Sequence, residues 1–192
     1  MNFLSIKFFV FLLFIGCTSV NTALSHVIPE DELRNQVYLS DREALAQVFQ
    51  GIRKIKKEKR KLTSAQAKNF KQLSGQTIRE RKKFFYAGET NNGKTYATID
   101  KANANSHPPT EAKFVLLIDS EGRVKDIHIM EYKGPQRAEL ISREFLDQYK
   151  GKIADSDFSQ ITSNQGPTPS VLAMSQSVRQ TLISFKILYL AP

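Results

Sequence analysis

The chain has 192 residues, of which 41% are hydrophobic and 24% are charged. This composition predicts one globular domain and excludes two large ones. The formal net charge of +9 would favour a nucleic-acid partner in a cytosolic protein, but the N-terminal segment indicates export and argues against that partner.

The first 17 residues have the pattern of a secretory signal. An apolar run from Phe8 to Ile15 is shorter than the roughly 20 residues that a membrane-spanning helix requires. The letters "FIGC" resemble the lipobox of bacterial lipoproteins, although Phe14 stands where that motif usually has Leu. We expect a lipid on Cys17 and a protein that faces the periplasm. Cleavage after "ALS" at 23–25 would instead release a soluble periplasmic protein.

After a predicted tether at 18–39, two helices are expected. The first lies within 40–55, where Ser40 and Glu43 have the spacing of a capping box and Leu45, Val48, Phe49, Ile52 and Ile55 mark one face. The second lies within 62–75, with Thr63 or Ser64 as its cap and Gly75 as its end. We expect it to turn Ala67, Phe70 and Leu73 inward.

Much of the positive charge lies in two short runs, "RKIKKEKRK" at 53–61 and "RERKK" at 79–83. The first run has no aromatic residue between its cations. We predict a solvated helix face there, and the alternative is contact with an anionic membrane surface or an acidic partner.

Beyond Arg79 the pattern changes to short segments rich in aromatic and β-branched residues. They predict strands at 82–89, 94–100, 112–120 and 124–132, the last two joined as a hairpin around Asp119 to Gly122. A helix is predicted over 135–151, with Pro135 near its start and Gly151 after its end, and it should bury Leu140, Ile141, Phe145 and Leu146.

The last predicted helix begins in the turn "GPTPS". Thr168 is a good N-cap, Pro169 suits the first helical position, and apolar residues then recur at helical spacing to Phe185. The order of elements predicts an α+β fold, an antiparallel sheet with N-terminal helices and two C-terminal helices in a single domain at 40–192. A helix start of this kind can bind a phosphate, although an ordinary Thr cap explains the same residues.

Other chemistry has little support in the sequence. Cys17 is the only cysteine, so the mature fold has no intramolecular disulfide and no cysteine-based metal or redox site. His26, His107 and His128 lack the short spacing expected of a metal site. Nucleophile-elbow, dinucleotide-binding and P-loop patterns are missing, so no catalytic residue is predicted.

The "GPTPS" turn resembles the GAT-x-S/T element of FMN-binding domains. These domains occur in the small flavin-bearing subunits of sodium-translocating NADH:quinone reductase and Rnf-type complexes, and in free-standing exported flavoproteins. The order of elements over about 40–186 is also similar, and the segments that carry this likeness are "LTSAQAKNFKQLSG", "FFYAGETNNGKTYATID", "FVLLIDSEGRVKDIHIMEYKGPQ", "REFLDQYKGK" and "SVLAMSQSVRQTL". In that family a flavin transferase joins FMN through its phosphate to the Thr of GAT.

The resemblance implies covalent FMN on Thr168, with Gly166 allowing close approach of the backbone and Ser170 binding the phosphate. It implies an electron carrier that serves redox partners, rather than an enzyme that transforms a substrate. The chain departs from the family's D-G-x-S/T-G-A-T at Thr162, Gln165 and Pro167. Non-covalent FMN, or a flavin-free anchored binding or assembly module that uses the basic run, are the alternatives.

Residues near the isoalloxazine ring can only be nominated from their position in the sequence. Tyr132, and Phe85 or Tyr86, could form an aromatic wall, although core packing explains such residues equally well. Glu131 and Arg137 flank the same turn and could bind the ring edge or the phosphate, with an ordinary ion pair as the alternative.

Overall fold

The computed structural model describes residues 35–52, 54–90, 93–107 and 109–191. The predicted signal and lipobox, Cys17, His26 and most of the tether lie outside the described residues. Within the described ranges, no helix combines the length and the apolar character needed to cross a bilayer.

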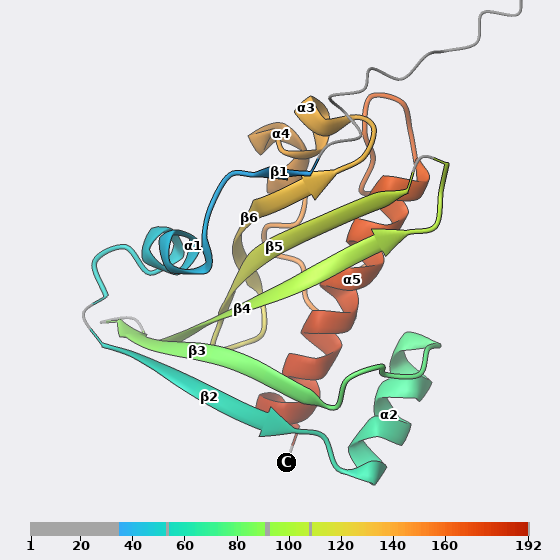
Figure 1. Ribbon diagram of the computed structural model, residues 1–192. Coiled ribbons are helices and arrows are strands. Elements are labelled where there is room, and N and C mark those ends of the chain that lie inside the picture. The colour runs from blue at the N-terminus through green and yellow to red at the C-terminus, as the bar shows by residue number, and fades with distance from the viewer. Residues whose placement is uncertain (1–34, 53, 91–92, 108, 192) are drawn as a thin grey trace, which may run out of the picture.

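The centre of the fold is a six-stranded antiparallel sheet, which confirms the α+β class (Figure 1). Its spatial order is β1-β6-β5-β4-β3-β2. The strands are β1 (Gln36–Val37), β2 (Ile55–Lys61), β3 (Lys82–Thr90), β4 (Gly93–Ala104), β5 (Thr110–Asp119) and β6 (Val124–Lys133). The four central strands match those predicted. The two edge strands were not predicted, and β1 lies inside the segment expected as tether.

The first predicted helix is shorter than expected. Helix α1 (Asp41–Val48) begins at a capping box in which Ser40 and Glu43 bond each other's backbone, as predicted. It ends at Phe49, and Ile55 already belongs to β2, so the prediction of a basic helix face at 53–61 is wrong for the described residues 54–61. The reason lies outside the segment: β2 pairs along its whole length with β3, and this tertiary contact overrides the helix propensity of the lysines, which is a weak determinant of structure.

The second predicted helix is confirmed as α2 (Ser64–Ser74). Thr63 caps its start in a second capping box, with Gln66, and Gly75 ends it in the left-handed conformation. Phe70 is buried as expected. Leu73 is exposed, contrary to the prediction.

The single helix predicted over 135–151 forms two short helices instead, α3 (Arg137–Leu140) and α4 (Arg143–Asp147) (Figure 1). Ser142 lies between them in an extended conformation, and its side chain accepts a bond from the Phe145 N–H, so it ends one helix and caps the next. Leu140, Phe145 and Leu146 are buried as predicted, whereas Ile141 is only partly buried.

The long C-terminal helix α5 (Pro169–Phe185) follows the N-cap Thr168, as predicted, and continues into a π-helical turn at Lys186–Leu190. It covers one face of the sheet, and α1 covers part of the other (Figure 1). Each face has its own buried cluster. The cluster under α1 consists of Ala44, Val48, Phe49, Ala97, Val115 and Met130. The cluster under α5 is larger and includes Phe85, Phe114, Tyr132, Val178 and Phe185.

Candidate functional site

Thr168 lies at the start of α5, in the loop that the sequence singles out. Its hydroxyl oxygen accepts a long bond, 3.4 Å, from the Val171 N–H, and the residue is half-buried between the exposed Pro167 and Pro169. The hydroxyl is therefore weakly held and close to solvent. This is the geometry of an N-cap with Pro in the first helical turn.

The loop before Thr168 is a tight turn closed on itself. Gly166 donates to the Ser163 carbonyl at 2.9 Å, while the Ser163 hydroxyl donates to the Gly166 carbonyl at 3.0 Å. Gly166 has φ +84°, and a Cβ added there would meet nothing within 4 Å. Gly166 is thus needed for its backbone conformation, and the space beside it is open.

Helices α3 and α4 hold this loop in place. The Gln148 side chain clamps the backbone of Thr162, donating to its carbonyl at 2.9 Å and accepting from its N–H at 3.0 Å. A carboxylate oxygen of Glu139 accepts from the Asn164 N–H. A cavity of about 170 Å³ lies between these helices and the loop, which is smaller than the roughly 300–1,000 Å³ of typical small-molecule pockets.

Ser170 directs its hydroxyl toward the core of the protein. Its side chain is 3% exposed, and its hydroxyl oxygen is 2.6 Å from that of Thr110 on β5, also buried. Gly134 closes the other side, since a Cβ built there would lie 2.9 Å from the Thr110 hydroxyl. The Ser170 side chain therefore joins α5 to the sheet and does not face a group on Thr168.

The nominated aromatic wall is not assembled at the loop. Tyr132 is 1% exposed, with its hydroxyl bonded to the Pro135 carbonyl at 2.7 Å, and Phe85 is fully buried in the α5 cluster. Tyr86 is half-buried on the opposite face, beside the α1 cluster. The expectation that these residues line a flavin ring is corrected. Tyr132 and Phe85 are core residues under α5, and strand alternation directs Tyr86 to the other face of the sheet.

The charged residues nominated beside the same turn are also engaged in the structure. Glu131 forms an ion pair of 2.9 Å with Lys113, which itself lies 2.8 Å from Asp41 of α1. The hydrogen bond from Lys113 lowers the pKa of Glu131 below its ordinary value. Arg137 is 8% exposed at the start of α3. The ion-pair alternative holds for Glu131.

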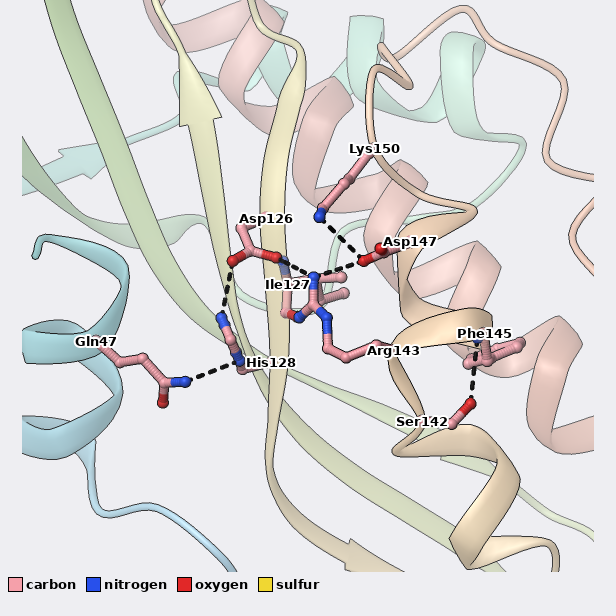
Figure 2. A network of polar contacts seen from close by, with 9 residues as sticks. All are labelled: Gln47, Asp126, Ile127, His128, Ser142, Arg143, Phe145, Asp147 and Lys150. Atoms are coloured by element: carbon pink, nitrogen blue, oxygen red, sulfur yellow. Dashed lines mark hydrogen bonds and ion pairs between the residues drawn. The ribbon is translucent and has the colours of Figure 1, made fainter.

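A polar network joins β6 to α1 and α4 (Figure 2). One carboxylate oxygen of Asp126 lies 2.9 Å from the His128 ring nitrogen, and the other accepts a hydrogen bond from Arg143 at 2.7 Å. Arg143 also donates to the Ile127 carbonyl at 3.0 Å. Burial opposes ionisation of Asp126, but the hydrogen bonds from Arg143 and the Ile127 N–H, together with His128, lower its pKa below the ordinary value. The network fixes α4, and through Gln148 it supports the loop.

A larger cavity, about 370 Å³, lies elsewhere, between α2 and α5 over β3 and β4. Asp100 at this cavity accepts from Lys83 at 3.3 Å and from the Thr181 hydroxyl at 2.8 Å. These bonds hold α5 against the sheet. No group of three metal-ligating side chains occurs among the described residues.

The described residues fit the phosphate end of a nucleotide better than its ring. In the first turn of α5, Pro169 has no N–H, while Val171 and Leu172 donate to the side chain and the carbonyl of Thr168. This leaves the Ser170 backbone N–H as the donor that the helix start offers to an anion. None of the nominated aromatic side chains lines the loop to receive a ring.

Several residues that shape this site were missed by sequence reasoning. Gln148, Glu139 and Thr110 act from elements that only the fold brings together, so no local pattern marks them. Gln136 is different: it has φ +60° in the sequence "KGPQR", a conformation uncommon outside glycine and often found at functional sites. Its side chain lies 3.5 Å from the Ser163 hydroxyl.

Comparison of the chain with protein-family models, with curated proteins and with solved structures gives no match. The assignment of a function therefore depends on the site itself.

Proposed function

We propose that the chain is an exported electron-transfer flavoprotein that carries FMN on Thr168. The observation that carries the proposal is the half-buried, weakly bonded Thr168 hydroxyl at the start of a 17-residue helix. A phosphoester there would lie at the positive end of the helix dipole, beside the Ser170 N–H and the open space at Gly166.

In this proposal, bound FMN supplies the redox chemistry. The chain holds the phosphate at the helix start, and α3 and α4 fix the loop. A flavin transferase would complete the protein, and redox proteins of the cell envelope would donate and accept electrons. A lipid on Cys17 would keep the protein at the periplasmic side of the membrane.

The test is production of the protein in a bacterial host with an active flavin transferase, followed by intact mass and mapping of the Thr168 peptide. We expect a mass increase equal to FMN less water on that peptide. Thr168→Asn is the matched control, because Asn remains a good N-cap but has no hydroxyl to esterify. Flavin that survives denaturation of Thr168→Asn, or an unmodified wild-type peptide beside a flavinylated second substrate, would contradict the proposal.

The second candidate is a flavin-free binding or assembly module on the same scaffold. It is favoured by the departures at Thr162, Gln165 and Pro167 and by the core positions of Tyr132 and Ser170. The three departures are exposed, so Thr162→Asp, Gln165→Ser and Pro167→Ala can be combined without disturbing the core. If only this triple variant gains flavin, the natural chain is the flavin-free module.

A further inference from the structure

One part of the sheet lies beyond the cover of α1. Helix α1 contacts β4, β5 and β6, and Phe49 and Ile52 cover β3 at Gly88. The rest of this face is formed by β2 and the first half of β3 (Figure 1). We call it the basic-aromatic face, and its residues are Ile55, Lys57, Lys59 and Lys61 from β2 with Lys82, Phe84 and Tyr86 from β3.

The charge on the basic-aromatic face has one sign. Cross-strand pairing sets Lys57 opposite Tyr86, Lys59 opposite Phe84 and Lys61 opposite Lys82, so these side chains share one face. None of the side chains that β2 and β3 direct to it is acidic. Its four lysines are exposed and form no ion pair with a described residue. The opposite side of β2 differs, because Glu58 there pairs with Arg60 at 2.9 Å.

Apolar side chains lie among these lysines. Phe84 and Ile55 are each 41% exposed. Their apolar surface stays in contact with water, which is unfavourable. The Lys57 ammonium nitrogen lies 4.8 Å from the Phe84 ring centroid and 5.5 Å from that of Tyr86, so cation–π attraction holds it over the rings. The basic-aromatic face therefore carries lysines without an acidic partner in the described part of the chain, and exposed apolar side chains next to them.

We propose that the basic-aromatic face docks on a membrane surface that contains anionic lipids. Each lysine near such a surface contributes about 1 kcal/mol, equal to roughly fivefold in affinity, while Phe84 and Ile55 enter the boundary between headgroups and acyl chains. Single-stranded nucleic acid fits less well, because bases bind by stacking on open ring faces and Lys57 already covers these rings. The inference does not depend on flavin at Thr168.

The chain contains no tryptophan, which gives a direct test with the full-length protein. Phe84→Trp places the sole tryptophan on the proposed face, and Leu172→Trp places it at an exposed position on α5 (Leu172 is 55% exposed). Each protein is mixed with vesicles of brominated phosphatidylcholine, with and without phosphatidylglycerol. We expect a blue shift and quenching for Phe84→Trp only with phosphatidylglycerol, and neither for Leu172→Trp. Because the readout is local, an N-terminal anchor in the bilayer does not mimic it.

Charge variants in the Phe84→Trp protein test the lysines. Lys57→Gln with Lys59→Gln removes two charges from the face and is expected to weaken vesicle binding roughly 30-fold. Lys68→Gln with Lys71→Gln removes the same charge from exposed positions of α2 and is expected to have little effect.

Three outcomes would overturn the proposal. Equal quenching at both tryptophan positions would show that docking does not use this face. Quenching that is independent of phosphatidylglycerol would remove the role of the lysines. If oligodeoxythymidylate quenches Phe84→Trp saturably and the vesicles do not quench it, the face binds single-stranded nucleic acid instead.

Discussion

The hydroxyl of Ser170, at the start of α5, has a structural role and not the phosphate-binding role that was expected. The resemblance to FMN-binding domains implied that this hydroxyl binds the phosphate at the helix start, where backbone N–H groups also point toward an anion. In the fold it meets Thr110 at 2.6 Å in a buried position. Contact between residues 60 positions apart leaves no mark on the local sequence, so this pairing could not be predicted.

Ser170→Ala should therefore destabilise the protein without preventing flavin attachment. The Thr110 hydroxyl loses its buried partner, which costs about 1–3 kcal/mol, and urea unfolding measures this loss. Adding Thr110→Val should recover part of it, because both polar groups are then gone. A Ser170→Ala protein with normal stability but no flavin would show instead that the hydroxyl serves the cofactor.

Gly134 lies against Thr110 and leaves room for its hydrogen bond with Ser170. It has φ +143°, and a Cβ there would lie 2.9 Å from the Thr110 hydroxyl and 3.2 Å from its Cα. Gly134→Ala should lower the free energy of unfolding by about 1–3 kcal/mol through overpacking. Gly93→Ala is a close control, since Gly93 has φ +109° and the nearest atom to a Cβ built there is 3.8 Å away. Equal losses in the two variants would mean that backbone strain alone, and not the Thr110 contact, limits the position.

At the level of elements, the sequence predicted what local signals determine. The capping box at Ser40, a cap at Thr63 or Ser64, the Gly75 stop and the β-rich composition of the central strands act within a few residues, and all were predicted. The capping box between Thr63 and Gln66 was not predicted. β2 was missed because its identity depends on pairing with β3. The position of Phe84 and Tyr86 beside the lysines was not predicted for the same reason, since the pairing of β3 with β2 brings them together.

The network around Asp126 predicts how α4 responds to acid. Because the folded state lowers the pKa of Asp126, its contribution is present above the unfolded value of about 3.9 and is lost as pH falls through the lower folded value. Urea unfolding from pH 7 into this acid range should show a steeper loss of stability in the wild type than in Asp126→Asn. Identical acid limbs would mean that other carboxyl groups account for the loss.

On the scale of the whole molecule, the C-terminal turn ties the edge of the sheet to its core. Tyr189 packs against Phe85, Tyr96 and Phe185 with ring centroids 4.8–5.2 Å apart, and its hydroxyl donates to Glu58 of β2 at 3.0 Å. Burial and the Glu58 bond raise the pKa of Tyr189 to about 12, against an opposing effect of Arg60. The last turn thus holds the edge strand β2 in place.

Alkaline unfolding should report this contact. A raised folded pKa gives stability that is complete below the unfolded value of about 10 and is lost as pH rises toward about 12. Tyr189→Phe keeps the ring packing, costs about 1 kcal/mol for the hydrogen bond, and should flatten the alkaline limb. Burial also raises the pKa of Tyr149, but Tyr149 is present in both proteins. Parallel alkaline limbs would contradict the assignment.

Helix α5 would set where electrons leave the proposed flavoprotein. It packs on the face of the sheet opposite α1, whereas the basic-aromatic face lies on the α1 side (Figure 1). With the basic-aromatic face on lipid, a flavin at Thr168 would therefore lie on the side of the sheet that faces away from the bilayer. A carrier dissolved in the hydrocarbon core could not reach it, so the redox partner would have to be a protein that extends into the aqueous space.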